Sequence, residues 1–356
     1  MATQIKTRRA CNCTITAAHL EISYHNNSKS IPATIHTSYC IAGHEPLYID
    51  FRRNALKAYK IRLLPMPTSV KLFAKISRFE FLLPNLGSLI MGIAWGASPP
   101  LDQVKGIILV LISFLVINLS SIIGAQANTL YDYELDLKDP RKKELTQALE
   151  QFGHKKIRNI IILETCLTLI LVSALTLYLQ EPILLILWII GISLGIAFSA
   201  PPLRLKAKFW IGPICQMLVL AVFPVLFAYY AFTYETNTYF LIALLGLSLT
   251  VYGVIVPTEI RDYFGDKTQG IQTLTVRLGL RKAMSMGIIL LSTGATLTAV
   301  SLFLEWTNNQ HPIIGVAVLA IPIAAVYILS KFLKLRYLTK EYETQTIKTN
   351  SSSKEK

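Results

Sequence analysis

The stretch VKGIILVLISFLVINLSSIIGAQANTLYDYELD, residues 104–136, decides the fold. Residues 104–127 carry one charge, Lys105, and are otherwise mostly apolar. A helix needs about 20 such residues to cross the roughly 30 Å hydrocarbon core of a bilayer. The stretch therefore predicts a transmembrane helix that ends in an acidic segment running from Asn128 to Asp136.

The rest of the chain repeats this apolar pattern. The sequence is 53% hydrophobic, and its apolar residues gather in long runs instead of the short, scattered elements of a soluble protein. Helices are expected because backbone polar groups have no water to bond in lipid. We therefore predict an all-α, polytopic transmembrane helical bundle of about eight helices. The expected spans are 79–97, 104–127, 157–179, 182–198, 210–231, 239–257, 284–304 and 312–333.

Positive charge is distributed unevenly between the predicted connections. The chain has 35 Lys and Arg against 21 Asp and Glu, a net charge of +14. These cations precede the first span or follow spans two, four, six and eight, and the other connections have almost none. This is the positive-inside pattern, which favours a multi-pass membrane protein over a nucleic-acid binder. It places both termini and the acidic segments on the cytoplasmic side, or the stromal or matrix side of an organelle.

The two ends of the chain differ from its middle. Residues 71–337 form the expected membrane domain, and residues 338–356 are expected to be a disordered cytoplasmic tail. Residues 1–70 are polar, rich in hydroxyl groups and poor in acid. Two interpretations of them stay open, a disordered extension upstream of a start at Met66 and an organellar transit segment. The five cysteines have the spacing of neither a disulfide framework nor a zinc site.

Two acidic groups lie just past helix ends on the same predicted side of the membrane. Asn128, Asp132 and Asp136 are four residues apart and so share one face of a helix. A second group, Glu259, Asp262 and Asp266, has similar spacing. Carboxylates about 4 Å apart repel by roughly 4 kcal/mol at an effective dielectric of 20, so a cation is expected between them. Oxygen ligands favour Mg²⁺, with Mn²⁺ as the alternative, and Mg²⁺ commonly bridges carboxylates to phosphates.

A basic segment follows the fourth span. Pro201 and Pro202 end that helix, and Arg204 and Lys206 come next, where they could meet a phosphate. The competing interpretation is that these cations only set membrane topology. Together with the acidic groups, they predict a site for a metal-bound diphosphate.

At this point the chain resembles the UbiA superfamily of intramembrane prenyltransferases. The resemblance extends from about Ser77 to the end of the eighth span. It is carried by the NxxxDxxxD motif that begins at Asn128, by FSAPPLRLK over 198–206, and by EIRDYFGDKTQGIQTLTVRLG over 259–279. The resemblance implies helices around a central cavity, with Mg²⁺ holding a polyprenyl diphosphate at its mouth. It also implies transfer of the prenyl group to a lipophilic acceptor, such as a quinone precursor, another aromatic compound or a carotenoid-like lipid.

The resemblance assigns roles to individual residues. Asp132, Asp136, Asp262 and Asp266 are the expected catalytic residues, and with Asn128 they are the expected metal ligands. The expected substrate-binding residues are Asn128, Ser199, Arg204, Lys206, Glu259 and Arg261. Three features depart from the family pattern: Glu259 stands where Asp is common, Lys138-Asp-Pro follows the first motif, and eight spans are counted where members commonly have nine.

Two other functions compete with prenyl transfer. A membrane terpene cyclase of the same fold would ionise the same diphosphate without an acceptor. A transporter would instead carry its acidic residues in mid-span, often beside broken helices. The acidic groups here lie at helix ends, which favours the enzyme.

Overall fold

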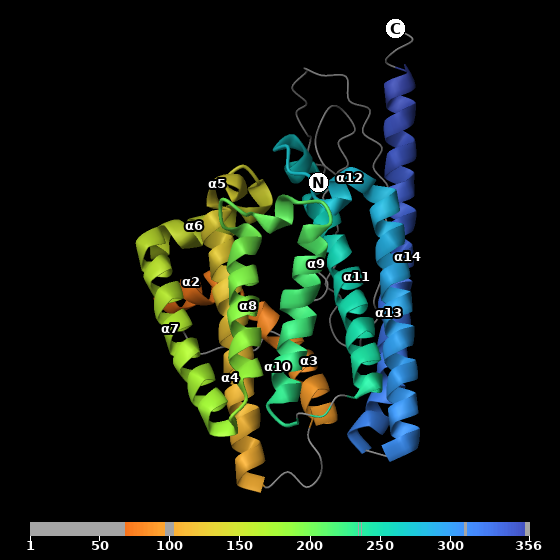
Figure 1. Cartoon of the computed structure of the whole chain (residues 1–356). Coiled ribbons are helices and arrows are strands. Elements are labelled where there is room, and N and C mark those ends of the chain that lie inside the picture. The colour runs from red at the N-terminus through yellow and green to blue at the C-terminus, as the bar shows by residue number, and fades with distance from the viewer. Residues whose placement is uncertain (1–67, 97–102, 234, 236, 310–311, 353–356) are drawn as a thin grey trace, which may run out of the picture. The chain divides into compact units, whose positions relative to one another are not determined.

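A computed structural model of the protein describes residues 68–96, 103–233, 235, 237–309 and 312–352. All regular structure in these residues is helical, which confirms the predicted all-α class (Figure 1). The elements are α2 (Thr68–Ile76), η1 (Phe79–Phe81), α3 (Leu82–Gly96), α4 (Gln103–Tyr131), α5 (Tyr133–Asp136), η2 (Pro140–Lys142), α6 (Lys143–Phe152), α7 (His154–Leu179), α8 (Pro182–Ser199), η3 (Leu205–Ala207), α9 (Ile211–Met217), η4 (Leu218–Val222), α10 (Phe223–Tyr230), α11 (Thr238–Thr268), α12 (Leu274–Leu278), α13 (Leu280–Asn309) and α14 (Pro312–Ser352).

Six helical segments among the described residues are long and apolar enough to cross a membrane. They correspond to the predicted spans two to seven, and the chain is a multi-pass membrane protein. The first predicted span is α3, which has 15 residues, and the eighth falls within α14. The fifth span is not one regular helix, because a π-helical turn, η4, joins α9 to α10. Such turns widen the helix locally and shift the faces of its two halves.

The first five spanning segments pack around one apolar core. This core joins α3, α4, α7, α8 and α10 and is centred on Val116, Val172, Leu184 and Phe227. Glycines allow α3 to lie directly on α10. A methyl group at Gly92 would lie 2.5 Å from the Ala228 side chain, a distance that real Cβ contacts do not reach.

Helices α11, α13 and α14 pack side by side in the second part of the bundle. Small residues make the contact of α11 with α13 unusually close. A methyl group at Gly246 would lie 2.5 Å from Thr298 Oγ1, and one at Gly294 would lie 2.5 Å from the Gly246 carbonyl oxygen. Close backbone approach of this kind is how helices associate in lipid, where apolar burial drives them together only weakly.

The last helix extends into the carboxyl-terminal end of the chain. A disordered tail is predicted for residues 338–356, and α14 continues without a break to Ser352 within this segment. The sequence after Pro322 contains neither glycine nor proline, so nothing ends the helix once it leaves the apolar segment. The predictions for residues 1–67, including the start at Met66, lie outside the described residues.

Candidate active site

The predicted site residues come from three helix ends that lie at the same end of the bundle. Helices α4, α8 and α11 all finish at the end of the bundle that carries α5 and α12 (Figure 1). The sequence explains why the helices α4 and α8 end there. Helix α4 ends at Tyr131, because the backbone of the next residue, Asp132, leaves the helical region (φ −94°, ψ 0°). Helix α8 ends at Ser199, shortly before two prolines.

Asp132 lies at the centre of the first part of the site. Its carboxylate is 3% exposed and accepts a hydrogen bond of 2.9 Å from the Asn128 Nδ2 amide. The Arg204 guanidinium lies 3.2 Å from Asp132 Oδ1, and the Lys206 ammonium contacts Oδ2. The same Asn128 amide donates to Ser199 Oγ at 2.7 Å. The NxxxD motif of α4 and the basic segment after α8 therefore form one polar cluster.

Asp136 forms a second ion pair one turn further along. Its Oδ1 lies 2.8 Å from the Lys142 ammonium, and its side chain is buried. Burial raises the pKa of Asp136 above its usual value, and the opposing effect of Lys142 only partly offsets this. Arg78, held at a positive φ of 47° between α2 and η1, places another positive charge near this carboxylate.

Lys142 lies between the two acidic groups. Burial alone would lower the pKa of its ammonium, but Asp262 and Asp136 outweigh burial and raise it. Arg141, the preceding residue, also faces Asp262, with 3.6 Å between Nη2 and Oδ1. Its Nη1 donates to the Arg261 carbonyl oxygen.

The carboxylate of Glu259 is held by neutral hydroxyl groups. Thr275 Oγ1 donates to Glu259 Oε2 at 2.7 Å, and the Tyr252 hydroxyl lies 3.3 Å from Oε1. Thr275 reaches this position because Thr273 caps α12 by accepting a bond from the Val276 amide. Glu259 is thus fixed against α12, one helical turn below Asp262.

Asp262 and Asp266 complete the second group. The Asp262 side chain is 28% exposed, and its nearest cations are Arg141 and Arg261, at 3.6 and 3.4 Å. Asp266 lies within electrostatic range of Asp132 and Lys206 as well as of Asp262. The electrostatic influence of Asp132 on Asp266, and of Asp136 and Asp262 on Lys142, indicates that the two acidic groups lie near each other.

The donor set suits a hard divalent cation. Every candidate ligand offers oxygen, the element that Mg²⁺ prefers. Within the described residues, however, no three Asp, Glu, His or Cys side chains lie close enough to form a ready-made metal cluster. Lysine and arginine occupy the nearest positions around Asp132 and Asp136 instead. This is compatible with Mg²⁺, which commonly uses one or two carboxylates and completes its shell with water and phosphate oxygens.

The predicted residues differ in how closely they join this site. Asn128, Arg204 and Lys206 contact Asp132, and Ser199 joins this cluster through Asn128. Arg261 is mostly exposed and contacts Asp262 through its Nε.

Sequence reasoning missed Arg78, Arg141, Lys142 and Thr275. The first three were interpreted only as charges that orient the chain in the membrane. The position of Lys142, six residues after Asp136, could have indicated a contact with the acidic motif. The positive-inside rule, however, explains any cation near a helix end equally well.

Comparison with known proteins identifies the family and the fold. The sequence model described as the UbiA prenyltransferase family matches residues 82–347. A search of curated proteins gave no match.

Solved structures show the same fold. A UbiA homolog from Archaeoglobus fulgidus bound to GPP and Mg²⁺ has a TM-score of 0.57 and 18% identity, covering 78% of this chain and 99% of that one. The same homolog bound to Cd²⁺ has a TM-score of 0.55 and 18% identity, covering 76% and 97%. A structure of digeranylgeranylglyceryl phosphate synthase has a TM-score of 0.51 and 17% identity, covering 78% and 95%.

The apolar spanning helices and the matching family model place the chain among the intramembrane prenyltransferases. Because the family model spans most of the chain, the protein belongs to the UbiA prenyltransferase family.

Proposed function

We propose that the protein transfers a prenyl group from a polyprenyl diphosphate to a lipophilic acceptor inside the membrane, with Mg²⁺ as cofactor. One observation carries this proposal: Asp132 is contacted by Asn128, Arg204 and Lys206 from two helix ends. Carboxylates and phosphate-binding cations are thus interleaved in one cluster, the combination that a metal-bound diphosphate requires. The A. fulgidus homolog bound to GPP and Mg²⁺ supports the same assignment.

Asp132, Asp136, Asp262 and Asp266 are the proposed metal ligands, with Asn128 assisting. Mg²⁺ bound there would act as a Lewis acid that neutralises charge on the diphosphate. The cations around Asp132 already balance its charge in this structure. We expect Arg204 and Lys206 to turn toward the diphosphate when it binds, leaving the carboxylate to a metal ion. Arg261, exposed at the rim, is placed to assist from the other side.

Neutralisation of the diphosphate charge favours cleavage of the bond between the prenyl group and the diphosphate. The allylic C–O bond breaks and its electron pair leaves with the diphosphate, whose charge Arg204 and Lys206 stabilise. The resulting allylic cation reacts with the acceptor, a new bond forms at the acceptor atom, and that atom loses one proton. The helices lie in the bilayer, where apolar surroundings keep water away from the allylic cation. Glu259, anchored by Thr275 and Tyr252, would hold α11 in register and contact the substrate.

The decisive test identifies the product. Membranes containing the protein are incubated with labelled C15 or C20 prenyl diphosphate and Mg²⁺, with and without lipid extract as a source of acceptors. We expect label in a larger lipid only when acceptor is present. The Asp132→Ala and Asp262→Ala variants provide the negative controls, and undiminished product from both would contradict the proposed site.

The same assay separates the competing reactions. A cyclic hydrocarbon or alcohol formed from the diphosphate alone would indicate a terpene cyclase instead. Labelling from either side of sealed vesicles also tests the orientation, since we propose that the site opens on the cytoplasmic, stromal or matrix side.

A further inference from the structure

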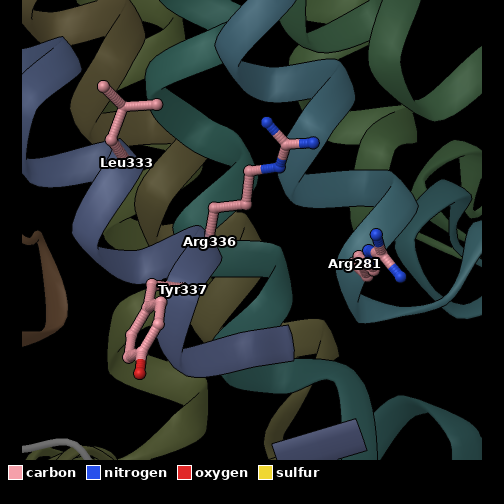
Figure 2. Close-up of a pocket in the computed structure, with 4 residues that line it drawn as sticks. All are labelled: Arg281, Leu333, Arg336 and Tyr337. Carbon is pink, nitrogen blue, oxygen red and sulfur yellow. The ribbon is translucent and has the colours of Figure 1, made fainter. Parts of the chain in front are cut away.

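A cavity between α13 and α14 gives no reason to place a ligand in it. It has a volume of about 250 Å³ and is lined by Arg281, Leu333, Arg336 and Tyr337 (Figure 2). Both arginines already interact with other groups of the chain, so their charge does not call for an anion. A polar group that does lack a hydrogen-bond partner lies in the fifth spanning segment, below the candidate active site.

This group is the side chain of Gln216, on α9. The fifth spanning segment, Ile211–Tyr230, is otherwise strongly apolar. The amide oxygen Oε1 of Gln216 is buried, and it has no hydrogen-bond partner in the part of the chain that the structure describes. A buried acceptor without a donor is costly in a membrane, where water does not replace the missing bond. A polar side chain inside a spanning helix is therefore expected to have a functional partner.

Gln216 points into the bundle. Ile211 and Ile214 are exposed and mark the outer face of α9. At about 100° per residue, Gln216 lies about 170° from the middle of that face. The Cys215 thiol donates to a carbonyl oxygen of α8, and Met217 packs in a cluster with residues of α11. Gln216 therefore faces the interior between α8 and α11.

Gln216 is one helical turn below a cation of the candidate site. Gly212 lies against the backbone of Lys206, since a methyl group at Gly212 would be 3.1 Å from the Lys206 carbonyl oxygen. Gln216 follows Gly212 by four residues, so it shares that face about 6 Å deeper in the membrane. Lys206 itself contacts Asp132. The amide is thus close beneath the place proposed for the diphosphate.

Small residues leave room at the same depth. Gly124 is one turn below Asn128 on α4, and apart from the adjoining backbone of α4 no described atom lies within 4 Å of where its side chain would begin. Gly195 is one turn below Ser199 on α8, and a methyl group there would meet Val219 at 3.8 Å. Because Asn128 donates to Ser199 Oγ, both glycines border the interior beneath this hydrogen-bonded pair.

The π-helical turn η4 keeps a large side chain from the space below Gln216. In a regular α-helix Leu220, four residues further on, would lie directly below Gln216 on the same face. Because η4 widens the helix over Leu218–Val222, Leu220 is instead exposed. Turns of this kind are frequent at functional sites.

The acceptor is the substrate that can supply the missing donor. The proposed diphosphate would be held one turn above, at Lys206, and the prenyl chain is a hydrocarbon without a hydrogen-bonding group. An amide oxygen needs an O–H or N–H donor. A carotenoid hydrocarbon offers neither, whereas an acceptor with a hydroxyl group offers the first.

We propose that Gln216 accepts a hydrogen bond from a hydroxyl group of the acceptor and so orients the acceptor beneath the diphosphate. This inference rests on the proposed prenyl transfer and narrows its substrate class. A site built to hydrogen-bond a hydroxyl group strongly rejects compounds that lack one. Hydrocarbon carotenoids are thereby excluded as acceptors, and Gln216 becomes a residue that determines specificity.

The test separates binding of the acceptor from binding of the diphosphate. Membranes with the wild type or Gln216→Met receive labelled C20 prenyl diphosphate, Mg²⁺ and increasing amounts of lipid extract. Methionine keeps the length of the side chain and removes the amide. We expect the apparent KM for the extract to rise about 10-fold, the effect of one buried hydrogen bond, and the KM for the diphosphate to stay unchanged. Ile214→Met, on the outer face of the same helix, is the matched control and should change neither constant.

A second arm uses the unmodified protein and does not depend on how a variant folds. Acetic anhydride blocks the hydroxyl groups of the extract, mild alkaline hydrolysis restores them, and hydrocarbons are unaffected by both. The wild type should label no lipid in the acetylated extract and should regain activity after hydrolysis.

Three outcomes would overturn the inference while leaving prenyl transfer intact. They are labelling that survives acetylation, an unchanged KM for the extract in Gln216→Met, and an equal rise in the KM for the diphosphate. If the wild type labelled no lipid even with untreated extract, prenyl transfer itself would be refuted, and the role of Gln216 with it.

Discussion

The two acidic groups have nearly the same spacing but different surroundings. In the α4 group (Asn128, Asp132 and Asp136) both carboxylates are buried and paired with lysine or arginine. In the α11 group (Glu259, Asp262 and Asp266) Glu259 is held by hydroxyls and Asp262 is more exposed, with cations no nearer than 3.4 Å. Sequence spacing alone hides this difference. The α4 group carries its own neutralising charges, whereas the α11 group is the more open to an incoming cation.

The largest effect is expected when Asp132 is removed. The Asp132→Ala variant loses a proposed metal ligand and leaves Arg204 and Lys206 without their carboxylate. We expect kcat/KM to fall about 10³-fold, which corresponds to roughly 4 kcal/mol of transition-state stabilisation. The free energy of unfolding should also fall by about 2 kcal/mol, less than for a fully buried pair because both cations are partly exposed.

Labelled-product assays and thermal unfolding in detergent check both quantities. Glu134→Ala is the matched control, since Glu134 lies between Asp132 and Asp136 but is exposed. If the control lost as much activity as Asp132→Ala, the proposal that Asp132 itself binds the metal would be refuted.

Removal of Asp262 should separate activity from stability. The Asp262→Ala variant is expected to lose about 10²-fold in kcat/KM, because a proposed ligand is absent. Its thermal unfolding temperature should fall less than that of Asp132→Ala, since the ion pairs of Asp262 are longer and partly exposed. Mg²⁺ titration should show weaker metal binding than in the wild type. A large drop in unfolding temperature would show that the two groups do not differ as described.

A smaller effect is expected at Lys206, which balances Asp132 in the α4 group. Lys206→Met should raise the KM for the prenyl diphosphate more than it lowers kcat, with kcat/KM reduced about 30-fold, or roughly 2 kcal/mol. Steady-state kinetics with one labelled diphosphate measures both parameters. Lys208→Met, in the same loop but exposed, should leave them unchanged. An equal effect of both changes would mean that only the net charge of the loop matters.

The smallest effect concerns the anchoring of Glu259. Thr275→Val removes the hydroxyl that donates to Glu259 Oε2 while keeping the side-chain shape. We expect this variant to lose about 10-fold in activity, which is the lower end of the range for removal of a supporting hydrogen bond. Thr275→Ser should restore most of the activity, because it returns the donor. Failure of serine to rescue would show that packing, and not the hydrogen bond, explains the loss.

Much of the fold could be predicted because hydrophobic length alone specifies a membrane helix. The predicted span of 104–127 lies within α4, and the four-residue spacing of Asn128 and Asp132 brings their side chains into contact. The sequence did not predict that α14 continues to Ser352, since polar composition says little about a helix that is already nucleated.

The parts of the site that escaped prediction depend on tertiary contacts. The bond between Thr275 and Glu259 exists only because the chain turns back after α11 and starts α12 with Thr273 as its cap. No local pattern encodes that turn geometry. Lys142 was overlooked for another reason. The positive-inside pattern already explained all the cations in this connection, so no further role was sought for Lys142. Its proximity to Asp262 is apparent only in the three-dimensional structure.

The glycine contacts between α11 and α13 limit how this molecule can move. Because the backbones already touch at Gly246 and Gly294, neither helix has room to slide sideways against the other. We therefore expect the two helices to move as one unit, so that the acidic residues at the end of α11 keep their positions relative to α13. This close contact depends on the two hydrogen atoms that stand where Gly246 and Gly294 would otherwise have side chains.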